Sequence, residues 1–67
     1  MVKVRNEDWL DDDQKEALRM VNQHKVVKAV YDNSIHRGWD EHAALRDVYD
    51  WLFYGGAEEK GITDFRP

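Results

Sequence analysis

The sequence predicts an all-α fold, a compact three-helix domain with a loose N-terminal arm and a C-terminal tail. Two observations lead to this prediction. Apolar residues recur at intervals of three and four in the second half of the chain, which is the period of a helix packed on one side. Acidic residues and glycines stand where such helices begin and end. A chain of 67 residues has room for one hydrophobic core, so residues 1–67 are expected to form a single domain.

The segment before the first helix alternates apolar and charged residues over Val2–Arg5, which is a strand pattern. No second clear strand follows for it to pair with, so we expect a loose arm. The alternative is a small α+β fold, in which this arm pairs with the valine-rich segment 26–31. The first helix is expected at about residues 12–22. Asp12 or Asp13 is its expected N-cap, because a carboxylate there accepts hydrogen bonds from unpaired backbone N–H groups.

The second helix is expected at about residues 24–36. Its apolar residues are Val26, Val27, Val30, Tyr31 and Ile35. The apolar residues of the first helix are Ala17, Leu18, Met20 and Val21. The two sets would lie on different faces if the two helices were continuous, so we expect a bend near residues 22–24. The β-branched residues also permit a strand here. Gly38 is expected to close this element, because glycine readily adopts the left-handed conformation that ends helices.

The third helix, expected at about residues 40–54, has the clearest pattern. Asp40 is its expected N-cap, and Gly55-Gly56 ends it. Its expected core face consists of Ala44, Leu45, Val48, Trp51 and Leu52. The tail that follows contains Ile62 and Phe65.

Composition and charge narrow the class of protein. Ten basic against fourteen acidic residues give a net charge of −4, which argues against nucleic-acid partners, because phosphate backbones attract clustered Lys and Arg. No apolar run has the length of a membrane span, and the N-terminus lacks the apolar centre of a signal peptide. With no cysteine in the chain, we expect a cytoplasmic protein without membrane contact or disulfides.

Residue types that carry chemistry are present, but their spacing does not fit a reaction. His36, Asp40 and His42 match no familiar metal-ligand pattern. Ser34 lies close to His36 in sequence, but residues within one helical turn do not readily form a catalytic triad with an oxyanion hole. We therefore expect no catalytic, cofactor-binding or metal-binding residues, and no enzyme activity.

A second row on the third helix, at His42, Arg46, Tyr49 and Phe53, also follows helical spacing. Two apolar faces on one helix need two surfaces to pack against. Either both faces are covered within the domain, or the second face binds a partner through aromatic and arginine side chains. The candidate interface consists of Trp39, His42, Arg46, Tyr49, Phe53 and Tyr54.

The function expected from these observations is a small non-catalytic protein–protein interaction module that regulates or inhibits a larger enzyme or assembly. Short length, acidity and an aromatic helix are similar in type to those of small bacteriophage or bacterial accessory proteins. The partner is another protein or a second copy of the chain. One alternative is an acidic mimic of nucleic acid, which would use Asp40, Glu41, Asp47 and Asp50. Another is a small helix-turn-helix-like DNA binder, helped by the basic residues Lys25, Lys28 and Arg37.

Overall fold

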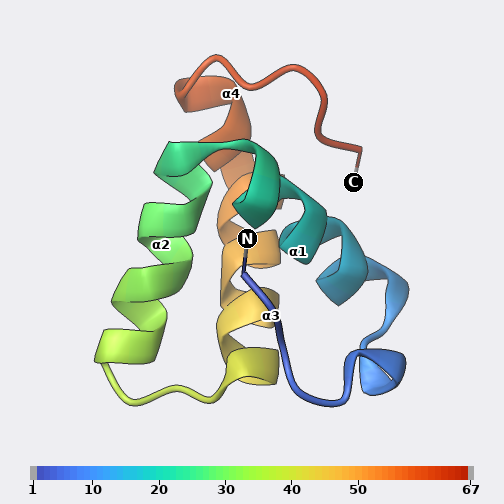
Figure 1. Cartoon of the computed structure of the whole chain (residues 1–67). Coiled ribbons are helices and arrows are strands. Elements are labelled where there is room, and N and C mark those ends of the chain that lie inside the picture. The colour runs from blue at the N-terminus through green and yellow to red at the C-terminus, as the bar shows by residue number, and fades with distance from the viewer. Residues whose placement is uncertain (1, 67) are drawn as a thin grey trace.

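Three helices joined by short turns make up most of the protein (Figure 1). The computed structural model describes residues 2–66, so Met1 and Pro67 lie outside the described part. The elements in chain order are the 3-10 turn η1 (Glu7–Trp9), α1 (Asp12–Gln23), α2 (Lys25–His36), α3 (Glu41–Trp51), the wide turn η2 (Leu52–Gly56) and the short α4 (Ala57–Glu59). No strand occurs within residues 2–66. The all-α prediction is confirmed, and segment 25–36, where a strand was also possible, is a helix.

The N-terminus of α1 is capped one or two residues earlier than predicted. Asp11, not Asp12 or Asp13, accepts a hydrogen bond from the backbone N–H of Gln14 (2.8 Å), and the Gln14 side chain accepts one from the backbone N–H of Asp11 (3.0 Å). This reciprocal capping box needs a Gln or Glu three residues after the cap, a spacing that excludes Asp12. Asp13 has Glu16 at that spacing, but the Glu16 carboxylate accepts from Arg19 instead.

The predicted break between the first two helices is confirmed at His24. Its backbone is extended (φ −129°, ψ 124°), and its N–H donates to the Met20 carbonyl at the end of α1 (2.9 Å). Helix α2 begins with the next residue. A single extended residue changes the helix direction, so α1 and α2 pack side by side over α3.

The buried face of α2 differs from the predicted one. Val27, Tyr31 and Ser34 are buried, whereas Val26 and Val30 are half-buried and Ile35 is 37% exposed. Apolar residues occur on two sides of this helix, and the turn at His24 decides which side faces the core. That orientation is a tertiary effect that the spacing of valines does not determine.

Helix α3 begins as predicted, with Asp40 accepting a hydrogen bond from the backbone N–H of Ala43 (2.7 Å). Its buried residues are Ala44, Leu45, Val48 and Tyr49, and Leu52 follows in η2. Regular α-helix ends at Trp51 rather than at residue 54, because the chain widens into η2. Gly55 has a positive φ of 110°, and at Gly56 a Cβ atom would collide with the Trp51 ring. Both glycines are therefore required for the turn.

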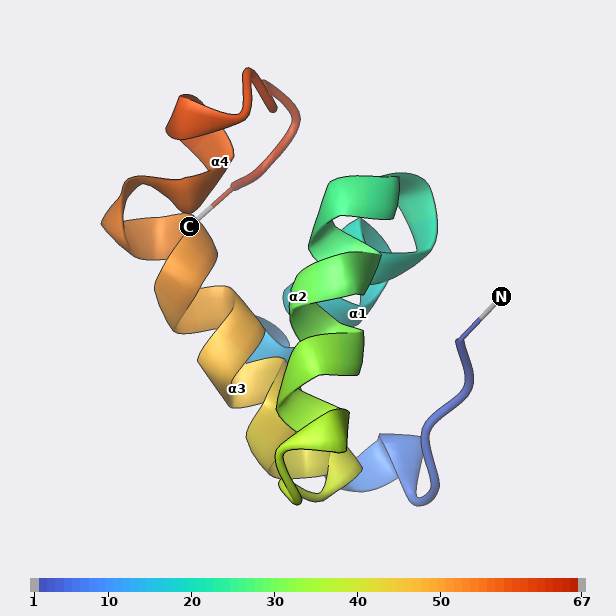
Figure 2. The same ribbon diagram turned by 90° about the vertical axis from the view of Figure 1, so that its left-hand side faces the viewer.

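The N-terminal arm is not loose, contrary to the prediction. Val4 is buried, the Val2 N–H donates to the Asn22 side chain (2.6 Å), and the Arg5 N–H donates to Glu41 (2.8 Å). Alternation places both valines on the same side of the extended segment, where they cover apolar surface of the helices. Figure 2 shows the beginning of this arm and α3 on opposite sides of the α1–α2 pair, whereas Arg5, further along the arm, contacts the start of α3. Because α1 and α2 both pack on the same side of α3, the opposite side of α3 has no covering helix.

Candidate functional site

Tyr49 belongs to the core, so the predicted row on α3 is not one continuous exposed strip. The residue is only 9% exposed. Its ring meets that of Phe65 from the C-terminal tail edge to face, with centroids 5.6 Å apart, and it stacks on Phe53 at 6.1 Å. Desolvation raises the pKa of the Tyr49 hydroxyl, and the negative charge of Asp13 adds to this effect. The tail therefore covers the part of the row that contains Tyr49.

His42 joins α3 to the N-terminal arm. Its ring Nε2 lies 2.8 Å from the carbonyl oxygen of Arg5, so Nε2 carries the proton and donates to that oxygen. The backbone carbonyl of His42 accepts from the Gln14 side chain (2.9 Å), which also ties this end of α3 to α1. The His42 side chain is half-buried. These contacts give His42 a structural role within the chain.

Arg46 joins α3 to the start of α1. Its guanidinium contacts the carboxylate of Asp11 and lies 3.8 Å from that of Asp13. Half of the Arg46 side chain remains exposed. Although the side chain is half-exposed, the positive charge of Arg46 is paired with Asp11 and Asp13 of the same chain.

The other three predicted interface residues are exposed. Trp39 and Phe53 are each 53% exposed, and Tyr54 is 82% exposed. Positions 43, 46, 47, 50 and 53 recur at the helical spacing of three and four, so they share the side of α3 that faces away from the core. We call this surface the outer α3 face, formed by Trp39, Ala43, Arg46, Asp47, Asp50, Phe53 and Tyr54. In Figure 2, α1 and α2 lie on the same side of α3.

A shallow groove occupies the first half of the outer α3 face. It encloses about 220 Å³ and is lined by Trp39, Ala43, Arg46, Asp47 and Asp50. Asp47 accepts a hydrogen bond from the hydroxyl of Ser34 (2.9 Å), which is only 1% exposed. Within residues 2–66, neither Asp47 nor Asp50 forms an ion pair. We refer to this feature as the Trp39 groove.

An exposed aromatic pair occupies the other end of the face. The rings of Phe53 and Tyr54 meet edge to face with centroids 5.2 Å apart. Tyr54 leaves the helical conformation (φ −87°, ψ 23°) as the chain enters the glycine turn. The requirement for Gly55 and Gly56 thus also determines where the Tyr54 ring projects.

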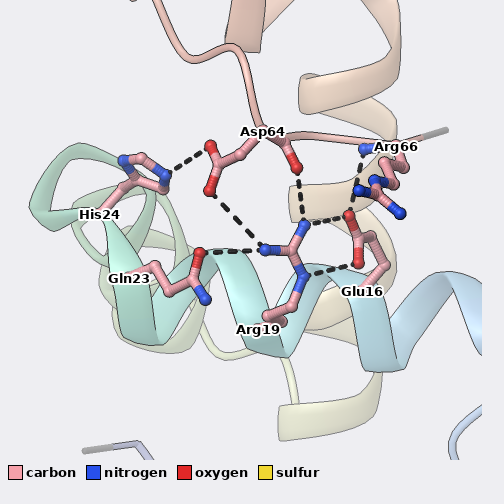
Figure 3. A network of polar contacts seen from close by, with 6 residues as sticks. All are labelled: Glu16, Arg19, Gln23, His24, Asp64 and Arg66. Atoms are coloured by element: carbon pink, nitrogen blue, oxygen red, sulfur yellow. Dashed lines mark hydrogen bonds and ion pairs between the residues drawn. The ribbon is translucent and has the colours of Figure 1, made fainter.

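A second polar cluster holds the C-terminal tail on α1 (Figure 3). Arg19 lies at its centre and donates to Glu16 (2.9 Å), to Gln23 (2.9 Å) and to the carbonyl of Asp64 (2.8 Å). His24 lies 2.9 Å from the Asp64 carboxylate. The backbone N–H of Arg66 donates to Glu16 (3.1 Å). We call these six residues the tail network.

The tail network shifts the titration of its acids. The hydrogen bond from Arg19 lowers the pKa of Glu16. Desolvation is the largest single effect on Asp64 and raises its pKa, but the hydrogen bond from His24, a backbone hydrogen bond and the charges of His24 and Arg19 together outweigh it, so the pKa of Asp64 is also lowered. Sequence reasoning missed this cluster, because its halves lie at opposite ends of the chain. The only local signal was the spacing of Glu16, Arg19 and Gln23 along one helix face.

The polar residues considered for catalysis are separated by the fold. Ser34 donates to Asp47 rather than to a histidine, and His42 donates to the backbone. In the part of the chain that the structure describes, no group of three or more His, Asp or Glu side chains is placed to hold a metal ion. Across residues 2–66, no helix has the length and apolar character needed to cross a bilayer. Comparison with protein-family models, curated proteins and solved structures finds no match for this chain.

Proposed function

We propose that this chain is a small non-catalytic protein-interaction module that binds its partner through the outer α3 face. The observation that carries the proposal is the exposure of Trp39, Phe53 and Tyr54 at the two ends of α3, next to the side of this helix that faces away from α1 and α2, while the core closes without them. Aromatic side chains bring large apolar area to protein interfaces, and they are enriched there. Clustered exposed aromatics on a small protein mark an interaction surface.

The dimensions of the outer α3 face suit a protein partner. Trp39 and Phe53 are fourteen residues apart. At 1.5 Å per residue this separation is about 20 Å along the helix axis, although Trp39 lies just before the helix. Two aromatic anchors at that distance, with charged residues between them, resemble the apolar anchors and polar surroundings of a protein interface.

The charges on this surface favour a protein over a nucleic acid. Helices α2 and α3 follow one another across a short turn, as in a helix-turn-helix, but the exposed side of α3 carries Asp47 and Asp50. Its cation, Arg46, is engaged by Asp11 and Asp13. Such a surface repels phosphates. An acidic mimic of nucleic acid is also disfavoured, since the carboxylates on this surface are few and exposed aromatic groups lie at both ends of it.

The proposal is tested by affinity capture from lysate of the source cell with three tagged proteins. These are the unmodified chain, the double variant Phe53→Ser/Tyr54→Ser, and Trp9→Ser as a control. Trp9 is 75% exposed but lies in η1, outside the outer α3 face. Loss of aromatic anchors commonly costs about 2 kcal/mol, or about a thirtyfold drop in affinity.

The expected result is a set of proteins retained by the unmodified chain and by Trp9→Ser but lost with the double variant. Sedimentation of the same proteins shows whether a second copy is the partner. Equal retention by all three proteins, with no self-association, would contradict the proposal.

A further inference from the structure

The Trp39 groove carries negative charge that the chain itself does not neutralise. Asp47 and Asp50 are exposed on its wall, and within residues 2–66 neither pairs with a cation. Arg46 also lines the groove, but Asp11 and Asp13 hold its guanidinium. The groove therefore presents uncompensated carboxylates next to a half-exposed indole ring.

The shape of the groove follows from its residue types. Asp47 and Asp50 are three residues apart on α3, so their side chains lie on the same face, one helical turn from each other. Ala43 lies one turn before Asp47 and has only a methyl group, which leaves the space beside Trp39 open. The hydroxyl of Ser34, fixed in the core, holds the Asp47 carboxylate in place (2.9 Å).

This combination of an aromatic face and two carboxylates is complementary to arginine. A guanidinium stacks on an indole ring, and its planar fork donates paired hydrogen bonds to carboxylates. Lysine carries a compact, strongly hydrated charge that makes neither contact as well. Apolar stem atoms of the guest side chain can lie against Ala43.

We propose that the Trp39 groove binds an arginine side chain presented by a basic segment of a protein partner. This inference rests on the proposed function and adds the chemistry of the partner to it. The aromatic pair Phe53–Tyr54 then contacts an apolar part of the same partner. Arginine supplies the specific contact, and the net charge of −4 favours approach of a basic segment.

The test is a nuclear magnetic resonance titration with a blocked synthetic peptide in which three arginines alternate with glycines. Two matched peptides contain citrulline, which keeps the shape but removes the charge, or lysine. The expected result is a saturable shift of the Trp39 indole N–H and of the Asp47 and Asp50 amides, with affinity in the millimolar range, on the order of 1 mM. We expect the lysine peptide to bind more weakly and the citrulline peptide not to bind.

Two charge variants separate a specific site from general attraction. Asp47→Asn/Asp50→Asn removes both negative charges, and the amide oxygen introduced at position 47 can still accept the hydrogen bond from Ser34. Glu58→Gln/Glu59→Gln makes the same change in net charge on the exposed acids of α4. We expect the first variant to bind the arginine peptide about fivefold more weakly or worse, and the second to bind nearly as the unmodified chain does.

Equal losses in the two charge variants, or equal binding of the arginine and lysine peptides, would overturn the inference. So would the absence of a saturable Trp39 shift at about 10 mM peptide.

These outcomes are distinct from failure of the proposed function. If Phe53→Ser/Tyr54→Ser abolishes capture of a partner but the peptide does not bind, the arginine site is wrong and the interaction module stands. If the peptide binds but no partner is captured, the arginine site stands and the proposed interaction module is contradicted.

Discussion

Ser34 shows how a single polar residue links the core to the surface. The side chain is buried where α2 meets α3, and its hydroxyl donates to the exposed carboxylate of Asp47. A buried hydroxyl is costly unless it is hydrogen-bonded, so this contact satisfies Ser34 and orients Asp47 at once. The sequence alone suggested Ser34 only as an implausible nucleophile near His36, because its partner lies thirteen residues away on another helix.

Replacing Ser34 tests this link. We expect Ser34→Ala to lower the free energy of unfolding by about 1 kcal/mol, since one hydrogen bond is lost and no polar group is left buried without a partner. Chemical denaturation measures this change. The same variant should weaken binding of the arginine peptide, because Asp47 is no longer held. Unchanged stability together with unchanged peptide binding would show that the Ser34–Asp47 contact has neither role.

At the scale of elements, helix caps are the best guide that the sequence offers, to within about one residue. Asp40 was identified correctly, whereas the prediction of Asp12 or Asp13 as the cap of α1 was wrong, because the cap is Asp11. Gln14 decides between the three neighbouring aspartates, since its side chain accepts from the backbone N–H of Asp11 and its own N–H donates to the Asp11 carboxylate. Asp11 also contacts Arg46, so its carboxylate serves both the helix cap and the α1–α3 ion pair.

The aspartates of α1 provide a matched comparison. We expect Asp11→Ala to destabilise the protein by about 0.5–2 kcal/mol, because it removes the cap and the partner of Arg46. Asp12→Ala should cost less, since Asp12 is exposed and contributes only to the helix dipole. Thermal denaturation of the two variants side by side checks the order. A larger loss for Asp12→Ala would move the cap to Asp12.

The tail network predicts a dependence of stability on pH. Glu16 has a pKa below its ordinary value of 4.5, chiefly because Arg19 donates to its carboxylate, and the pKa of Asp64 is below its ordinary value of 3.8. A carboxylate whose pKa is lowered by folding stabilises the protein fully above its unfolded value. That stabilisation is lost as pH falls through the folded value. The melting temperature should therefore decline as the pH falls from about 5 to about 3.

Glu16→Gln identifies the residue responsible. The substitution removes the titrating carboxylate and its charge but keeps an oxygen that can accept from Arg19. Because the attraction between the carboxylate charge and Arg19 is lost, the variant should melt lower than the unmodified chain at neutral pH. Because position 16 no longer titrates, the variant should show a smaller decline in melting temperature in acid. Because the pair lies near the surface, the expected difference at neutral pH is about 0.2–1 kcal/mol. Glu58→Gln is the control, as an exposed acid of α4 outside the network. An identical pH profile for Glu16→Gln and the unmodified chain would exclude Glu16 as the source.

At the scale of the whole molecule, the sequence predicted the three helices, the break at His24 and most of the core, because caps, glycines and apolar spacing are local signals. It did not predict which side of α2 faces inward, nor that Val4 and Phe65 pack on the helices. Those contacts join segments far apart in the chain. For the same reason the row on α3 could not be divided by sequence into covered Tyr49 and exposed Phe53.

This division between covered and exposed residues gives α3 two roles. Its inward face, with Leu45, Val48 and Tyr49, closes the core against α1, α2 and the tail. Its outer face contributes little to the core and is available to a partner. Substitutions on the inward face should therefore affect stability, and substitutions on the outer α3 face should affect binding, although residues of the two faces are interleaved in the sequence.

The most direct test of this claim measures the melting temperature and partner capture of Tyr49→Ala and of Phe53→Ser/Tyr54→Ser in parallel. Truncating the buried ring of Tyr49 should cost about 3 kcal/mol, which lowers the melting temperature by about 10–20 °C for a domain of this size. The double variant should melt within a few degrees of the unmodified chain and lose its partner. A double variant that melts as low as Tyr49→Ala, or one that stays stable and keeps its partner, would contradict the assignment of the outer α3 face.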